Sequence, residues 1–120
     1  MVSRVLIVED DDVLRWLMTE AITHLGYEAT GCISADAALL KMQVNDSFDL
    51  VITDVMMPGQ CDGIGLAKAI WSTSPDLPII IVSGNTVIPS GLLPANGRFI
   101  AKPCTFDTLN RTMLELLALR

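Results

Sequence analysis

Carboxylates, a hydroxyl and an amine stand directly after four apolar stretches of this 120-residue chain: Glu9 with Asp10, then Asp54, Ser83 and Lys102. Carboxylates that lie close together repel, and one of them stays protonated unless a cation lies between them. Oxygen ligands without thiolate or imidazole suit a hard ion such as Mg²⁺, which binds one or two carboxylates together with phosphate oxygens. A lysine and a hydroxyl beside such acids suit phosphoryl transfer, in which an aspartate can be the nucleophile.

The elements that must position these residues alternate along the chain. The apolar stretches are apolar on both faces, which is typical of parallel strands covered on both sides. Stretches of helical period separate them, which predicts an α/β doubly wound sheet with right-handed crossovers and helices on both faces. The predicted strands are Arg4–Val8, Tyr27–Cys32, Phe48–Thr53, Pro78–Val82 and Phe99–Ala101.

The helices are predicted from their periods and caps. One starts near Val13, where Asp11 or Asp12 can cap it, and others follow Ser34, Asp62 and Thr105. The last has an apolar face made of Phe106, Leu109, Met113, Leu116 and Leu117. Residues 85–97 contain two prolines and two glycines, which leaves room for a short, irregular helix at most.

In such sheets the ligand site lies beyond the carboxyl ends of the strands, where the strand order reverses. The first strand ends at Glu9 and Asp10, the third at Asp54, the fourth at Ser83 and the fifth at Lys102. We therefore expect these side chains to meet at one edge of the sheet. Taken singly, each could be a solvated surface group or a turn residue, and their joint placement favours a site.

Composition limits the other functions. A net charge of −6 argues against a direct nucleic-acid surface, which needs clustered lysines and arginines. The apolar stretches are too short to span a membrane, and no signal peptide is recognised, so we expect a cytoplasmic protein. Three widely spaced cysteines and a single histidine predict reduced thiols and no zinc site.

Four segments, in order, resemble the marker segments of response-regulator receiver domains in two-component signalling, with the chemotaxis regulator as the type. They are VLIVEDD at 5–11, DVMMPG at 54–59, VSG at 82–84 and FIAKP at 99–103. The resemblance extends from about residue 4 to residue 117. It implies a flavodoxin-like sheet of order 2-1-3-4-5 in one receiver domain, 1–120, with a short or irregular fourth helix.

The resemblance also implies roles for individual residues. Asp54 would be the phosphoacceptor, and its partners would be a sensor histidine kinase or a histidine phosphotransfer protein. Mg²⁺, or Mn²⁺ in its place, would be bound by Asp54, by Asp10, by Glu9 through water and by the backbone carbonyl of Met56. Lys102 would contact a phosphoryl oxygen across a cis Lys-Pro bond.

Two further positions would form the switch. Ser83 would hydrogen-bond the phosphoryl group, and Phe99 would be the aromatic that turns inward in response. The domain would then be a phosphoacceptor, not an enzyme acting on other substrates. It would signal through a protein-interaction surface, without binding a membrane, and could dimerise on phosphorylation.

The chain departs from the family pattern in four places. The loop after Asp54 is one residue longer than usual, and the stretch between Ser83 and Lys102 is short. Phe99 replaces the commoner tyrosine, and Cys104 stands where an aromatic residue is usual. All but the first of these affect the output surface more than the acceptor site.

Two rival functions remain open from sequence. A pseudo-receiver would keep the fold as a non-phosphorylated interaction module, and Mg²⁺ titration would separate the two. A metal-dependent phosphatase on a similar sheet would need a second acid just after Asp54, where Val55 and Met56 are apolar. With the last helix ending close to Arg120, the chain could act alone or be part of a hybrid kinase or a longer regulator.

Overall fold

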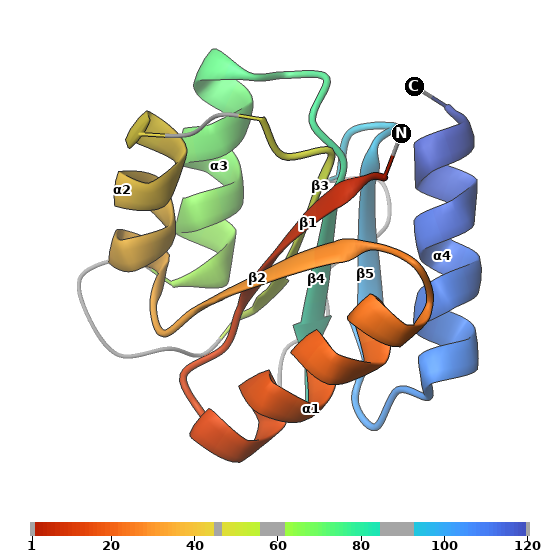
Figure 1. The fold of residues 1–120 in the computed structure, drawn as a ribbon. Coiled ribbons are helices and arrows are strands. Elements are labelled where there is room, and N and C mark those ends of the chain that lie inside the picture. The colour runs from red at the N-terminus through yellow and green to blue at the C-terminus, as the bar shows by residue number, and fades with distance from the viewer. Residues whose placement is uncertain (1, 45–46, 56–61, 85–92, 120) are drawn as a thin grey trace.

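The computed structural model describes residues 2–44, 47–55, 62–84 and 93–119. Within these ranges, five parallel strands form one sheet in the order β2-β1-β3-β4-β5 (Figure 1). The strands are β1 (Arg4–Val8), β2 (Glu28–Cys32), β3 (Leu50–Asp54), β4 (Ile79–Ser83) and β5 (Gly97–Ala101). The predicted doubly wound sheet is confirmed, because the order reverses between β1 and β3.

The helices cover both faces of the sheet (Figure 1). Helices α1 (Asp12–His24) and α4 (Phe106–Ala118) lie on one face, and α2 (Ala35–Val44) and α3 (Gly63–Thr73) lie on the other. Along β1, Val5 and Ile7 pack toward α1 and α4, while Leu6 and Val8 pack toward α2 and α3. This two-sided burial explains why the inner strands β1, β3 and β4 are almost continuously apolar, whereas the edge strands β2 and β5 carry polar residues.

The helix starts follow the predicted capping chemistry. The Asp11 side chain accepts a hydrogen bond from the backbone N–H of Leu14, so Asp11 caps α1 and Asp12 falls in its first turn. The hydroxyls of Ser34 and Thr105 accept in the same way at the starts of α2 and α4. Each cap fixes where a helix begins relative to the strand before it.

Some predicted details differ from the structure. Strands β3 and β4 each extend one residue further, so Asp54 and Ser83 are the last strand residues instead of loop residues. Phe106 was expected on the inner face of the last helix, but it is 47% exposed because it lies in the first turn, beyond the buried core of α4.

Two other predictions concern the segment before the last helix. The Lys102–Pro103 peptide is cis, as expected. Residues 93–96 form turns and no helix, and the rest of the predicted irregular stretch, 85–92, lies outside the described residues. No described helix is both long enough and apolar enough to cross a membrane.

Candidate acidic site at the sheet edge

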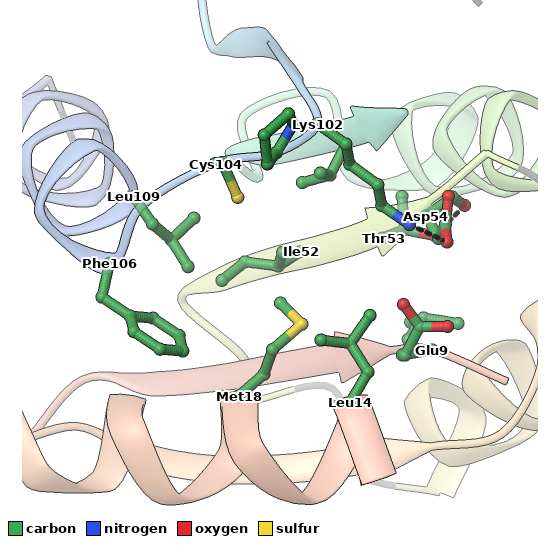
Figure 2. A pocket seen from close by; sticks show the side chains of 13 residues that line it. Glu9, Leu14, Met18, Ile52, Thr53, Asp54, Lys102, Cys104, Phe106 and Leu109 are labelled. Atoms are coloured by element: carbon green, nitrogen blue, oxygen red, sulfur yellow. Dashed lines mark hydrogen bonds and ion pairs between the residues drawn. The ribbon is translucent and has the colours of Figure 1, made fainter. Parts of the chain in front are cut away.

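The predicted acids meet at the carboxyl edge of the sheet. One carboxylate oxygen from each of Glu9, Asp10 and Asp54 lies within 4.8 Å of the others. Figure 2 shows Glu9, which follows β1, facing Asp54 at the end of β3. The Lys102 side chain, which follows β5, extends toward Asp54. Three segments far apart in sequence therefore supply one site, as the topological rule predicts.

Hydrogen bonding between strands fixes the backbone at the site. Asp54 pairs with Val82 across the sheet, and the N–H of Val55 donates to the Val82 carbonyl at 3.2 Å. On the other side of β4, the N–H of Lys102 donates to the Ser83 carbonyl at 2.9 Å. The acid and the amine are thus carried by ordered backbone, which favours a defined geometry.

Glu9 is the most unusual acid in the site, because it is only 3% exposed. The pKa of Glu9 is raised to about 7, mainly by burial, and a hydrogen bond from the Asp11 N–H to Glu9 Oε2 at 3.1 Å opposes this rise. Smaller contributions to this value come from a hydrogen bond with Asp10 and the negative charge of Asp54, which raise the pKa, and from the charge of Lys102, which lowers it. This carboxyl is costly to ionise without a positive charge beside it.

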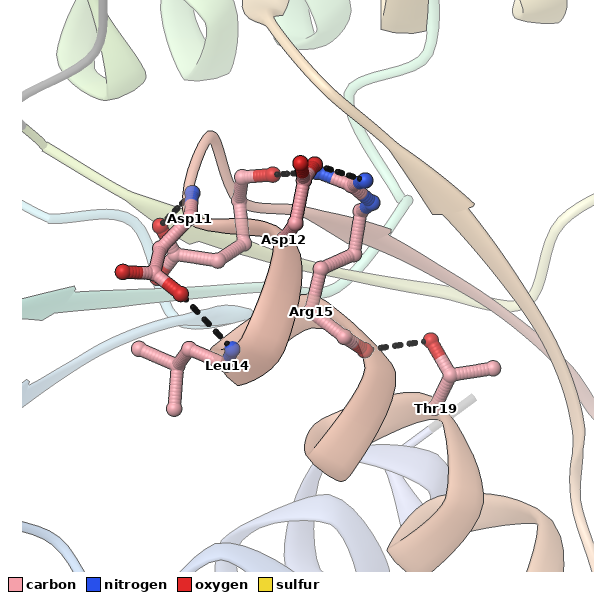
Figure 3. A network of polar contacts seen from close by, with 6 residues as sticks. Asp11, Asp12, Leu14, Arg15 and Thr19 are labelled. Atoms are coloured by element: carbon pink, nitrogen blue, oxygen red, sulfur yellow. Dashed lines mark hydrogen bonds and ion pairs between the residues drawn. The ribbon is translucent and has the colours of Figure 1, made fainter.

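The α1 N-terminus holds the Glu9 backbone in place. Arg15 donates from one guanidinium nitrogen to the Glu9 carbonyl oxygen at 3.0 Å and from the other to Asp12. Figure 3 shows this network, in which the Arg15 carbonyl also accepts from Thr19. The arginine therefore links the end of β1 to α1 and leaves the Glu9 carboxylate directed at the acid cluster.

Lys102 neutralises part of the charge on Asp54. Its Nζ lies 2.7 Å from Asp54 Oδ2, and the Asp54 side chain is only 11% exposed. Burial lowers the pKa of Lys102, but the hydrogen bond and charge of Asp54, together with the charge of Glu9, outweigh it and raise the pKa above 10.5. The amine therefore stays protonated and available to an anionic group bound at Asp54.

Ser83 and Phe99 lie on the neighbouring strands β4 and β5. Ser83 is buried at the end of β4 and pairs with Ala101 of β5. Phe99 pairs with Ile81 and is half-buried against the core on the α2 and α3 side. Because side chains alternate along a strand, Ser83 and Phe99 face the same side of the sheet. The predicted ligand Met56 lies outside the described residues.

The donor set fits a hard divalent cation. The clustered atoms are all carboxylate oxygens, and burial raises the pKa of one of the three carboxyls, that of Glu9. Glu9, Asp10 and Asp54 are the described residues that could hold Mg²⁺, and a bound dication would neutralise these carboxylates and nearby phosphoryl oxygens. Lys102, which donates to Asp54, would remain outside the ligand set.

The raised pKa of Glu9 predicts an unusual dependence of stability on pH. Between the unfolded pKa of 4.5 and the folded value of about 7, the folded protein binds more protons than the unfolded chain. Metal-free protein should therefore lose stability as pH rises through this window, by about 1–3 kcal/mol. Thermal melts with a chelator at pH 5 and pH 8 measure this loss.

The control is Glu9→Gln, which should show a smaller loss between the two pH values. Mg²⁺ should stabilise the wild type more at pH 8 than at pH 5, because it binds the ionised carboxylate. Equal pH profiles for the wild type and Glu9→Gln would contradict this interpretation.

Gly63 is a positioning residue that the sequence reasoning missed. It is the first residue of α3, and its N–H donates to the Val55 carbonyl at 2.9 Å. A Cβ atom at this position would lie 2.0 Å from the Asp54 carbonyl oxygen, far inside any allowed contact. The glycine therefore lets α3 begin directly against the backbone of the acid. The glycine after Asp62 was the available sequence signal.

The chain is similar to known proteins in both sequence and fold. A model of the response regulator receiver domain family matches residues 5–113. The response regulator receiver protein CpdR of Brucella abortus is 30% identical over 120 residues, covering 97% of this chain and 98% of CpdR. The uncharacterized transcriptional regulatory protein YrkP of Bacillus subtilis is 34% identical, covering 98% of this chain but 50% of YrkP. The chain thus spans about half of that relative.

Among solved structures, the response regulator TrrA of Thermotoga maritima, in complex with Mg²⁺-BeF, superposes with a TM-score of 0.85 at 29% identity. The match covers 96% of this chain and 99% of that one. The chain belongs to the response regulator receiver domain family of two-component systems. Receiver domains are signalling phosphoacceptors that bind Mg²⁺ in an acidic site, and they are not enzymes of the ordinary kind.

Proposed function

We propose that this chain forms one receiver domain over residues 1–120 and accepts a phosphoryl group on Asp54. The single observation that carries the proposal is the convergence of three carboxylates and one lysine at the end of β3. The donor would be the phosphohistidine of a sensor kinase or of a phosphotransfer protein. The phosphorylated domain would then present a changed surface to a downstream protein.

The residues have distinct tasks in this scheme. Glu9 and Asp10 hold the divalent cation together with Asp54, whose carboxylate is also the nucleophile. An Asp54 oxygen attacks phosphorus, a P–O bond forms, and the P–N bond to the donor histidine breaks. The leaving imidazole nitrogen keeps the electron pair of that bond. Lys102 moves its hydrogen bond from the carboxylate to a phosphoryl oxygen.

The switch would respond to the phosphoryl oxygens on Asp54, which are new hydrogen-bond acceptors. Ser83 donates its hydroxyl hydrogen to the phosphoryl group, and the space that it leaves lets Phe99 turn inward on the same side of the sheet. A local charge change is thereby converted into a change of surface around β4 and β5. Phosphorylation could also lead to dimerisation through this surface.

The test is incubation of the wild-type protein with acetyl phosphate and Mg²⁺, followed by intact-mass measurement and peptide mapping. We expect the mass of one phosphoryl group on the peptide that contains Asp54. Omitting Mg²⁺ and adding a chelator should prevent the gain, because Lys102 alone cannot offset three carboxylates, which then repel the anionic donor. A wild-type protein that gains no phosphate at saturating donor and Mg²⁺ would refute the proposal.

That negative result would favour the alternative, a non-phosphorylated pseudo-receiver. An interaction module would have no use for the phosphoryl-transfer chemistry that the acids and Lys102 can provide. Mg²⁺ binding by a protein that is not phosphorylated would point to a metal-bound structural role instead.

Replacing Lys102 by alanine separates cation binding from switching. Removing a positive charge beside the carboxylates should tighten Mg²⁺ binding by about fivefold, the equivalent of roughly 1 kcal/mol. The phosphoryl group on Asp54 would lack its amine partner, so NMR shifts at Ser83 and Phe99 on phosphorylation should be lost. Calorimetry and ¹H–¹⁵N spectra provide these measurements.

Lys102→Arg keeps the charge and is the matched control. It should leave Mg²⁺ affinity near the wild-type value. If Lys102→Ala kept the full spectral response to phosphorylation, the lysine would have no part in the switch.

A further inference from the structure

An apolar cavity of about 390 Å³ lies between α1 and α4 and reaches the acidic site (Figure 2). Glu9, Asp54 and Lys102 line one end of it. Its apolar walls include Leu14, Met18, Ile52, Cys104, Phe106 and Leu109. The polar groups are thus gathered at a single end, and the rest of the wall offers apolar contacts only, which is the usual composition of a small-molecule site.

The small side chain of Cys104 leaves this space open. Figure 2 shows its sulfur directed into the cavity, between Leu109 and Ile52. Receiver domains usually have an aromatic residue at this position, and its ring would occupy much of the cavity volume. Phe106 borders the cavity and stays 47% exposed. An apolar ligand would therefore cover surface that now contacts water.

The volume limits the size of the ligand. A cavity of about 150 Å³ can hold benzene, and ligand pockets in proteins begin at about 300 Å³. The cavity of 390 Å³ therefore has room for a flat body of one or two rings, and it is too small for a peptide helix.

The charge at the polar end selects the kind of head group. Glu9, Asp10 and Asp54 supply three carboxyl groups, whereas Lys102 supplies one ammonium that already pairs with Asp54. In the sequence, segments 56–61 and 85–92 add no Asp, Glu, Lys, Arg or His. An anionic head group would be repelled, and a cationic one would be attracted and would relieve the repulsion among the carboxylates.

We propose that this cavity binds a small aromatic amine, with its rings between α1 and α4 and its ammonium among the carboxylates. The ammonium would occupy the position that the proposed function gives to the divalent cation. The consequence for signalling rests on that proposed function: the bound amine excludes Mg²⁺ and slows phosphorylation of Asp54. Binding itself does not depend on phosphorylation.

The test uses three probes that share an indole ring: tryptamine, 3-methylindole and indole-3-propionate. Calorimetry and ¹H–¹⁵N spectra on metal-free wild-type protein should show tryptamine binding roughly tenfold tighter than 3-methylindole, with the carboxylate probe weakest. Spectral changes should centre on Met18, Cys104 and Leu109. Saturating Mg²⁺ should weaken the affinity for tryptamine at least tenfold and leave the affinity for 3-methylindole unchanged.

Two variants of Cys104 test whether tryptamine binding needs the open volume of the cavity, without changing the carboxylates. Cys104→Phe should abolish tryptamine binding while keeping Mg²⁺ affinity, because the ring fills the cavity and leaves the carboxylates in place. Cys104→Ser keeps the volume and should retain tryptamine binding. The Mg²⁺ competition in the wild-type protein decides the question even if Cys104→Phe does not fold.

The proposal is overturned if tryptamine fails to bind, if indole-3-propionate binds equally well, or if Mg²⁺ does not compete. These outcomes are distinct from a failure of the proposed function, which is measured by phosphate gain without any amine. A protein that takes up phosphate but does not bind tryptamine would refute only the proposed amine site.

Discussion

Asp54→Asn is expected to lose all detectable phosphate uptake from acetyl phosphate, whereas the wild type gains one phosphoryl group. The substitution keeps the size of the side chain but removes the nucleophilic oxygen charge, so no acyl phosphate can form. It also removes one of the three clustered carboxylates and the ion pair with Lys102. Mg²⁺ affinity should therefore fall as well, by tenfold or more, the equivalent of at least about 1.4 kcal/mol.

The matched control is Asp36→Asn, the same chemical change at an exposed position in the first turn of α2. It should leave phosphate uptake and Mg²⁺ affinity unchanged, because Asp36 lies outside the acidic cluster. Intact-mass spectra and calorimetry on both variants measure the two effects. Phosphate uptake by Asp54→Asn at the wild-type level would place the acceptor elsewhere in the chain.

Gly63→Ala is expected to cost about 3 kcal/mol of unfolding free energy or more, the upper end of what overpacking usually costs. The added methyl group would lie 2.0 Å from the Asp54 carbonyl oxygen and 2.9 Å from Val55 Cα. Both neighbours are backbone atoms held by the sheet, so neither can move aside as a flexible side chain would. Either α3 shifts away or the end of β3 is displaced.

A displaced strand end would move the Asp54 carboxylate relative to Glu9 and Lys102. We therefore expect phosphate uptake to slow by at least tenfold in any Gly63→Ala protein that still folds, since nucleophile and cation ligands must be aligned for in-line attack. Urea unfolding gives the loss of stability, and the time course of phosphate gain gives the rate.

Gly84→Ala is the control for this prediction. A Cβ atom there would lie 3.6 Å from Lys102 Cβ, an ordinary van der Waals distance. Its effect on stability should stay within about 0.5 kcal/mol. Equal costs for the two substitutions would show that the close approach of α3 to Asp54 is not the cause.

The sequence alone determined the doubly wound class of the sheet and the edge at which the acids meet, whereas the strand order was implied by the family resemblance. Strands apolar on both faces can be buried only between two helix layers, and parallel strands bring their carboxyl ends to one edge. Glu9, Asp10, Asp54 and Lys102 could therefore be expected at one edge of the sheet without coordinates, and the structure brings their side chains together there. Short-range hydrogen-bonding chemistry also predicted the caps at Ser34 and Thr105, and left Asp11 and Asp12 as alternatives for the first helix, where Asp11 is the cap.

Only the tertiary structure decided the features that depend on close contacts between distant segments. The burial that raises the pKa of Glu9, the close approach of Gly63 to Asp54 and the cavity beside Cys104 each depend on packing between elements far apart in sequence. Residue periodicity shows which face of a helix turns inward, but not how closely that face approaches its neighbour. For that reason the exposure of Phe106 was mispredicted, although its helix was correctly placed.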